Sequence, residues 1–454
     1  MSQDQITVET DESSPLDTFR QFFALERDVL VLSLAMFAFS LGFQMTNRFL
    51  PEYIVALGAS GIVVGLFGTV GNVVSAVFPY PGGAISDRIG SRYALTLFGL
   101  ISTLGFGVWL VAPNLGAITV AGVTIPSWIW IFAGLLLAQG WKSFGLGATF
   151  AVVKQATEPS RLAAGFASTE TFRRTAFLIG PVLAAVLIGF HPNFTVSFQS
   201  VLAVAVVFGT VGTVAQHVLY DASEDSIGDS FEGIEQVRRD LREMPEPLRP
   251  LLVGDTLVRF ANGMVYVFFV LVITQFYEVG FETTLSLAGF SYGIDLSPEA
   301  FFGYLLGIEM LIALLSMTPA SKAAERVGLK PVVALGFAVY ALFPVVLISG
   351  PEVLAPVMPL SWAMILIFAF SGLRFAGLPS HKALIVGPAK QGAGGRVTGT
   401  YYLLRNTVVI PSAALGGYLW EFVSPEIAFT IAAVIGVVGT GYFLAFGEEF
   451  EAYV

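Results

Sequence analysis

The stretch GAISDRIGSR, residues 83–92, recurs in altered form as SKAAERVGLK, residues 321–330. Both copies contain an acid, an arginine, any residue, a glycine, any residue and a base, in that order. Each copy stands between two long apolar runs, and the copies lie 238 residues apart in a chain of 454. A repeat with this separation predicts a chain built from two similar halves.

The composition is that of a membrane protein. Hydrophobic residues make up 55% of the chain, charged residues only 12%, and the mean hydropathy is +0.77. A run of about 20 apolar residues is long enough to cross a bilayer as a helix. Twelve such runs cover residues 29–54, 60–84, 92–112, 126–152, 162–189, 195–219, 250–276, 298–320, 331–349, 359–387, 397–420 and 426–446. We therefore expect an all-α membrane protein with twelve transmembrane helices.

Several functional classes are disfavoured by the residues present. The chain contains no cysteine, which excludes disulfides, thiol catalysis and cysteine metal sites. Its histidines, His191, His217 and His381, are too scattered for a metal motif. No nucleophile and base stand in a recognisable pattern, so we expect neither an enzyme nor a bound cofactor or metal. The net charge of −10 does not favour nucleic-acid binding, and acidic, lysine-poor soluble parts suit a halophilic cell.

The distribution of lysine and arginine predicts the orientation. Bases concentrate in cytoplasmic loops of membrane proteins. With both termini in the cytoplasm, no external loop of this chain contains Lys or Arg. The chain begins with a polar acidic tail rather than a cleavable signal, so the first apolar run is expected to stay as a helix. We predict a cytoplasmic acidic tail (1–27), an N-terminal six-helix half (28–220), a cytoplasmic linker (221–249), a C-terminal six-helix half (250–447) and a cytoplasmic tail (448–454).

The linker contains an amphipathic segment. Phe231, Ile234, Val237 and Leu241 recur at helical spacing within an otherwise polar stretch. This pattern predicts a helix on the cytoplasmic surface. The alternative is a disordered acidic linker.

Six helices, a long linker, six more helices and the motif G-x3-D-R-x-G-x-R between the second and third helices resemble the major facilitator superfamily over essentially the whole chain. The residues that carry the motif and its weaker second copy are Gly83, Asp87, Arg88, Gly90, Arg92, Glu325, Arg326, Gly328 and Lys330. The resemblance implies two pseudo-symmetric halves, a multi-pass protein of the cell membrane, and a cytoplasmic gate in which these loops latch the halves together. The alternative is that the loop charges only anchor the topology.

A second short repeat supports the two halves. Residues 140–145 read GWKSFG and residues 372–377 read GLRFAG, so both follow the pattern G-x-(K/R)-x-x-G. The copies are offset by 232 residues and fall in the equivalent fourth and tenth predicted helices. Each places a base, Lys142 or Arg374, near the middle of its helix.

Charges inside the predicted helices mark the candidate binding site. A charge in hydrocarbon is costly and normally faces the bundle interior, water or a partner. Apart from Lys382, seven bases lie there, which are Arg48, Lys142, Arg173, Arg174, Arg259, Arg374 and Arg405. Because bases outnumber acids and arginine binds carboxylate or phosphate through two hydrogen bonds, we predict an anionic or polyhydroxylated ligand. We place it near the midplane between Lys142, Arg374, Arg405 and either Arg173 or Arg174, with Asn262 and Asn406 as further polar contacts.

Three acids in these helices, Glu170, Asp255 and Glu309, are candidate proton carriers. A desolvated carboxyl group can titrate near neutral pH. The alternative for each is a permanent salt bridge between helices. Asp255 and Arg259 lie four residues apart on one helical face, which favours pairing.

Two further local expectations concern neighbours of these charges. Glu170 lies one turn before Arg173 and Arg174 and is their expected partner. His381 and Lys382 are expected at the membrane interface, with the lysine reaching towards water.

The leading hypothesis is a monomeric secondary active transporter that moves a small anionic or polar solute by alternating access, with protons as a candidate coupling ion. The alternative is a multidrug/proton antiporter that exports amphipathic compounds, and lipid-like substrates are a third option. Gly180 and Pro181 resemble part of the motif of such antiporters, although Ala184 and Ala185 stand where the motif has two glycines. A membrane sensor is disfavoured because the chain has no appended soluble domain.

Overall fold

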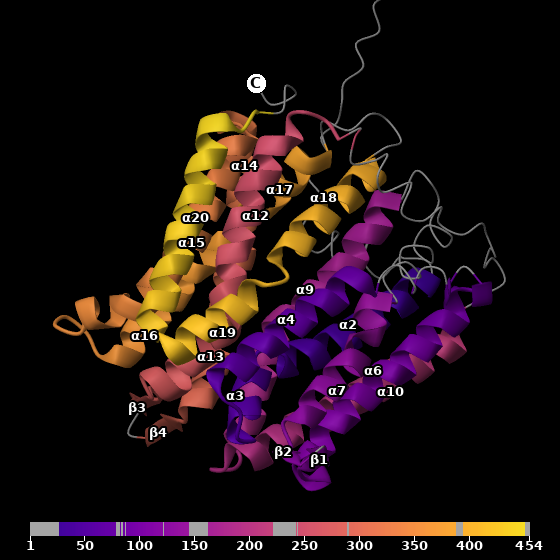
Figure 1. The fold of residues 1–454 in the computed structure, drawn as a ribbon, viewed down its shortest axis with the longest axis vertical. Coiled ribbons are helices and arrows are strands. Elements are labelled where there is room, and N and C mark those ends of the chain that lie inside the picture. Colours follow the sequence, from indigo (N-terminus) through magenta and orange to yellow (C-terminus); the bar gives the residue numbers. More distant parts are fainter. Residues whose placement is uncertain are drawn as a thin grey trace, which may run out of the picture.

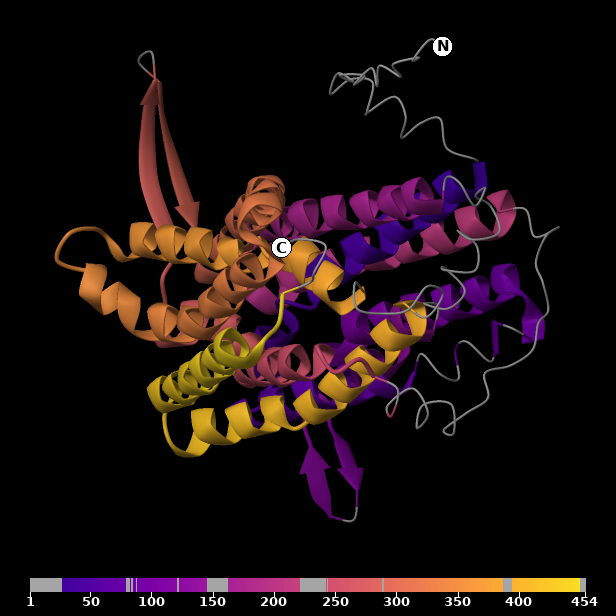
Figure 2. The same cartoon turned by 90° about the horizontal axis from the view of Figure 1, so that it is seen from above.

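The structure is a computed structural model, which describes residues 27–78, 82, 85–86, 88–120, 122–144, 162–220, 242, 244–287, 290–386 and 394–449. The predicted linker helix, most of both tails, Gly83 and Asp87 lie outside the described residues. The described chain forms a bundle of long helices with two short hairpins projecting from it (Figures 1 and 2).

The helical segments fall in the predicted apolar runs. Those before the linker are α2 (Arg27–Thr46), α3 (Leu50–Ala56), α4 (Gly61–Val77), α6 (Ser91–Leu115), α7 (Ile129–Gln139), the π-helical turn η1 (Gly140–Phe144), α9 (Leu162–Ile188) and α10 (Phe194–Leu219). Those after it are α12 (Leu248–Val265), the 3₁₀ turn η3 (Tyr266–Phe268), α13 (Phe269–Leu271), the π-helical turn η4 (Val272–Phe276), α14 (Pro298–Val327), α15 (Leu329–Leu354), α16 (Leu360–Gly372), the 3₁₀ turn η5 (Leu373–Phe375), α17 (Leu378–Val386), α18 (Gly394–Val409), α19 (Ser412–Phe422) and α20 (Pro425–Phe446).

Within the described residues, seven helical segments are individually long and apolar enough to cross a membrane. An eighth appears if α2 and α3, which meet at an angle of 44°, form one span. Pro51 at the start of α3 accounts for this break, because proline supplies no backbone donor and cannot continue a preceding helix. The count of twelve spans, the domain boundaries and the side of the membrane on which the termini lie remain predictions.

Two antiparallel hairpins correct the expectation of helices alone. Strands β1 (Ile118–Val120) and β2 (Val123–Ile125) pair with each other, as do β3 (Phe281–Leu287) and β4 (Phe290–Leu296). Their β-branched and aromatic residues favour extended structure once the chain has left the apolar run. Both hairpins project from one end of the bundle, and the C-terminal end of α20 lies at the opposite end (Figure 1). We call these the hairpin end and the terminal end.

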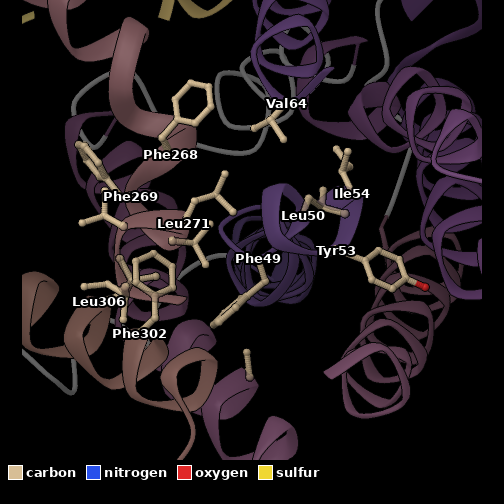
Figure 3. Close-up of a cluster of buried hydrophobic side chains, with 14 of the residues drawn as sticks. Phe49, Leu50, Tyr53, Ile54, Val64, Phe268, Phe269, Leu271, Phe302 and Leu306 are labelled. Atoms are coloured by element: carbon tan, nitrogen blue, oxygen red, sulfur yellow. The ribbon is translucent and has the colours of Figure 1, made fainter. Parts of the chain in front are cut away.

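The two halves share a hydrophobic core near the hairpin end. Phe49 from the α2–α3 turn packs edge-to-face on Phe302 of α14, with ring centroids 5.6 Å apart. Both side chains are essentially buried, and Figure 3 shows them within one cluster together with Tyr53 and Phe268. Because the cluster draws on both halves, it holds them together by burial of apolar surface.

Glycine allows a close approach between the halves. A Cβ atom at Gly65 of α4 would lie 2.5 Å from the carbonyl oxygen of Ala413 and 2.8 Å from the Cα atom of Gly417 in α19. Any larger residue at Gly65 would therefore force α4 and α19 apart.

The two copies of the charged loop share a backbone conformation. Gly90 precedes α6 with φ 81° and ψ 156°, and Gly328 precedes α15 with φ 89° and ψ 165°. A positive φ is strained for other residues, which explains glycine at this place in both copies. The sequence repeat is thus also a structural repeat.

Candidate functional site

Charged residues line several cavities in the described part of the chain, and two of these are named cavity A and cavity B here. Cavity A has a volume of about 120 Å³ and is formed by α2, η1 and α9. Its lining consists of Met36, Ser40, Phe43, Gln44, Asn47, Trp141, Lys142, Arg173 and Phe177. Among the residues that the structure describes, this lining contains two cations and no carboxylate.

The turn η1 positions Lys142 in cavity A. Residues 140–144 form a π-helical turn at the end of α7, and such turns are frequent at functional sites. The side chain of Lys142 is accessible and lines cavity A, whereas its neighbours Trp141 and Ser143 are buried. Lys142 and Arg173 therefore bring positive charge from two helices to one cavity.

Cavity B has a volume of about 200 Å³ and lies between the halves. Its lining comes from α4, α12, η3, α18 and α19 and consists of Gly68, Asn72, Arg259, Asn262, Gly263, Tyr266, Val267, Arg405, Asn406, Val409 and Ala413. The predicted polar contacts Asn262 and Asn406 both line it. Arg405 donates from Nε and Nη2 to the side-chain oxygen of Asn406, at 3.2 and 3.0 Å.

A buried carboxylate lies behind cavity B. Asp255 of α12 is fully buried and accepts from Arg259 Nε at 3.2 Å and from Arg405 Nη1 at 3.0 Å. The hydroxyl of Tyr401 donates to Asp255 at 3.0 Å, and His381 Nε2 lies 3.3 Å from the same carboxylate. The predicted pairing of Asp255 with Arg259 is confirmed. The cluster joins three helices, because the partners come from α12, α17 and α18.

A second buried carboxylate joins the halves. Glu309 of α14 accepts from Arg374 Nη2 at 2.5 Å, and its other oxygen accepts from the Ser371 hydroxyl at 3.3 Å. Arg48 of the first half approaches Glu309 to 3.8 Å and lies 4.0 Å from the ring centroid of Tyr266. Glu309 therefore forms a salt bridge, which is one of the two roles considered for it from the sequence, the other being a proton carrier.

Non-α turns carry several of these side chains. Lys142 lies on the π-helical turn η1, and Arg374 lies on the 3₁₀ turn η5. The two bases of the G-x-(K/R)-x-x-G repeat thus occupy equivalent breaks in the two halves. Tyr266 lies on a further 3₁₀ turn, η3. Interrupted helices near the middle of the membrane are typical of binding sites in transporters.

The structure does not bring the predicted ligands into one cavity. Lys142 and Arg173 line cavity A, whereas Arg405 lines cavity B. Arg374 is only 3% exposed and is paired with Glu309. In the second half, Glu309 holds Arg374 and Asp255 holds Arg405.

The remaining predicted residues of the first half lie on α9. Arg174 Nη1 contacts the sulfur of Met317 in α14 at 3.7 Å and so reaches the second half. Glu170 lies in the same helix, but its side chain is outside the described residues, so its role stays a prediction.

Three residues outside the predicted site take part in these buried contacts: Glu52, His381 and Tyr401. Glu52 of α3 is 9% exposed and accepts from Thr274 at 2.5 Å and from Gln275 at 3.1 Å, across the two halves. The position of Glu52 within the first apolar run, residues 29–54, is the sequence feature that could have indicated its role. His381 is buried at 3% exposure beside Asp255, and the buried Tyr401 donates to the same carboxylate.

The described residues of the gate motif lie at the terminal end. Arg88, Glu325 and Arg326 are exposed there. Arg92 Nε donates to the carbonyl of His217 at 2.8 Å, within the first half. The latch between halves remains a prediction.

The C-terminal segment caps the helix that follows the second copy. The carboxylate of Glu449 accepts from the backbone N–H groups of Leu329 and Lys330, at 3.0 and 2.8 Å. These are otherwise unpaired donors in the first turn of α15.

Comparison with known proteins agrees with this architecture. A family model described as Major Facilitator Superfamily matches residues 32–297. Uncharacterized MFS-type transporters from two Mycobacterium tuberculosis strains, CDC 1551 / Oshkosh and ATCC 25618 / H37Rv, are 30% identical over 198 residues. That alignment covers 43% of this chain and 42% of each relative, so the chain spans less than half the length of these relatives.

Solved structures with the same fold cover nearly the whole chain. The nucleoside transporter NupG and a bacterial homologue of the iron transporter ferroportin each give a TM-score of 0.70 at 12% identity, covering 93% of this chain and 99% of theirs. A POT family transporter in complex with 5-aminolevulinic acid gives 0.68 at 14% identity, covering 94% of this chain and 99% of its own. The chain is a multi-pass protein of the cell membrane, and it belongs to the major facilitator superfamily.

Proposed function

We propose that this protein is a secondary active transporter that moves a small anionic or polar solute by alternating access. The observation that carries this proposal is cavity A, where Lys142 and Arg173 face the same space among Ser40, Gln44 and Asn47. Positive charge from two side chains at the wall of one cavity favours an anion. A site for lipophilic cations would instead need a carboxylate at the cavity surface.

Cavity B supports the same substrate class from between the halves. Arg259 and Arg405 are 22% and 15% exposed, and together they exceed the single negative charge of Asp255. The amides of Asn262 and Asn406 add donors and acceptors that suit a polar solute. Cavities A and B are thus each lined by two cations.

The conformation is consistent with one state of an alternating-access cycle. At the hairpin end the halves touch through Glu52 and Gln275, and the backbone N–H of Gly61 donates to Glu421 at 2.8 Å. We propose that the terminal end, which bears the exposed bases Arg88 and Arg326, is cytoplasmic. The state would then face inward, like that of the bacterial ferroportin homologue, whose structure is of an inward-facing state.

We propose protons as the coupling ion, with Glu309, Asp255 and Glu170 as the candidate carriers. A pH gradient imposed on proteoliposomes would drive accumulation of the solute. Transport that ignores the gradient would overturn proton coupling and leave the solute proposal intact.

A ligand-stabilisation screen tests the substrate class, because a ligand of the native state raises its apparent stability. Purified protein would be heated with organic anions, neutral polyols and lipophilic cations. We expect the anions to raise the melting temperature most, and we expect Lys142→Gln and Arg173→Gln to abolish this effect. Lys322→Gln and Arg249→Gln are matched controls, since both residues are exposed at the terminal end. Stabilisation by cations alone would instead support a multidrug antiporter.

A further inference from the structure

Cavity A combines charge with aromatic walls. The ammonium of Lys142 lies 5.9 Å from the ring centroid of Phe43, and the guanidinium carbon of Arg173 lies 5.6 Å from that of Phe177. Phe43 is buried and Phe177 half-buried, so these two rings form apolar sides of the space that the cations border. A ligand here meets positive charge and ring faces at once.

Trp141 supplies a further donor without a partner. Its ring is 6% exposed and stacks on Phe39, with centroids 4.5 Å apart and planes inclined by 12°. Its Nε1 is buried and has no hydrogen-bond acceptor in the described part of the chain. A buried donor left unpaired costs about 1–3 kcal/mol. Trp141 itself is part of the lining of cavity A.

The size of the cavity sets a limit on the buried part of a ligand. An apolar cavity of about 150 Å³ is large enough to bind benzene. Cavity A, at about 120 Å³, accommodates a group of comparable size. A bare inorganic anion would fill little of this space and would leave the ring faces of Phe43 and Phe177 without apolar contact.

We propose that the substrate class is a small organic carboxylate that bears one flat aromatic group. The carboxylate pairs with Lys142 and Arg173, and the ring lies against Phe43 and Phe177. This inference rests on the proposed transport of an anion and narrows it, since it assigns both ends of the molecule to side chains of cavity A.

The test compares five probes on the purified full-length protein. The probes are benzoate, acetate, inorganic phosphate, benzyl alcohol and benzylammonium, and the readouts are intrinsic tryptophan fluorescence and melting temperature. We expect benzoate to bind at least tenfold more tightly than acetate or phosphate. We expect no binding of benzyl alcohol or benzylammonium, because each lacks the carboxylate.

Single variants separate the contribution of the carboxylate contact from that of the aromatic contact. Lys142→Gln should weaken benzoate binding at least tenfold, whereas Lys142→Arg keeps the charge and should retain most of it. Phe177→Leu should weaken benzoate several-fold and leave the weak binding of acetate unchanged. Lys322→Gln is the control, and the melting temperature without ligand shows that each variant is folded.

The outcomes distinguish this inference from the proposed function. If acetate or phosphate binds as tightly as benzoate and binding depends on Lys142, the aromatic carboxylate is overturned while anion transport stands. If no anion binds and benzylammonium does, both proposals are overturned.

Discussion

Glu309 and Arg374 form a buried ion pair, with Arg374 Nη2 2.5 Å from Glu309 Oε1 and both side chains 1% exposed. The pair lies within the second half, between α14 and η5. Arg48 of the first half approaches the same oxygen to 3.8 Å. A rocking motion that opens the hairpin end would separate Arg48 from Glu309, whereas Arg374 would move together with its carboxylate.

Removal of Glu309 alone should therefore destabilise the protein strongly. Glu309→Gln leaves Arg374 as a buried charge without its counter-ion, which costs about 3–5 kcal/mol. The double variant Glu309→Leu, Arg374→Met should recover much of the loss, because it removes both charges. Melting temperatures of the purified variants check this. Equal stability of the single variant and the unchanged protein would contradict a stabilising role for the Glu309–Arg374 pair.

Loss of Glu52 should open the hairpin end. Its carboxylate accepts from Thr274 and Gln275 of the other half, so Glu52→Ala removes hydrogen bonds that exist only when this end is closed. The chain contains no cysteine, so Ser40→Cys places one reactive probe in cavity A. We expect impermeant maleimide to label this cysteine from the terminal side in the unchanged background, and from both sides when Glu52 is replaced. If Glu52→Ala does not change the labelling, the hydrogen bonds of Glu52 have no role in closing the hairpin end.

Gly65→Ala should have a related effect through packing alone. The new Cβ atom would lie 2.5 Å from the Ala413 carbonyl, and overpacking of this kind costs about 1–3 kcal/mol. Gly71→Ala on the same helix is the matched control, since its Cβ atom would meet nothing within 4 Å. The control should be neutral or stabilise the helix by up to about 1 kcal/mol. Equal melting temperatures for both variants would contradict a close α4–α19 contact.

Substitutions of different residues in the Asp255 cluster should lower the melting temperature by different amounts. Asp255→Asn leaves Arg259 and Arg405 without their shared carboxylate, so we expect a large fall in melting temperature. Arg259→Gln should cost less, because Arg405, His381 and Tyr401 still contact the carboxylate. The reverse order would show that Arg259 holds the cluster together. Thermal unfolding of the two variants, measured side by side, decides the order.

Local pattern made much of the architecture predictable. The apolar runs locate the helical segments, because length and hydropathy are properties of each segment alone. The repeated loop and the G-x-(K/R)-x-x-G motif indicate two halves. Gly90 and Gly328 then adopt the same backbone conformation. The pairing of Asp255 with Arg259 was also predictable, because helical geometry places residues four apart on one face.

Contacts between segments could not be read in this way. Which carboxylate meets which base depends on the rotation of each helix about its axis and on its breaks, and spacing along the chain reports neither. The turn η1 directs Lys142 towards Arg173, and η5 directs Arg374 towards Glu309, although the two bases occupy equivalent places in the repeat. Glu52 and Gln275 lie 223 residues apart, and only packing of the two halves brings them together.

The sequence by itself thus determined a membrane protein of long helices, its internal repeat and the residues able to carry charge in the bundle, since these follow from composition and local spacing. Only the tertiary structure decided which charges are neutralised by partners and which face a cavity. The physical reason is that a buried charge takes its character from neighbours supplied by other helices.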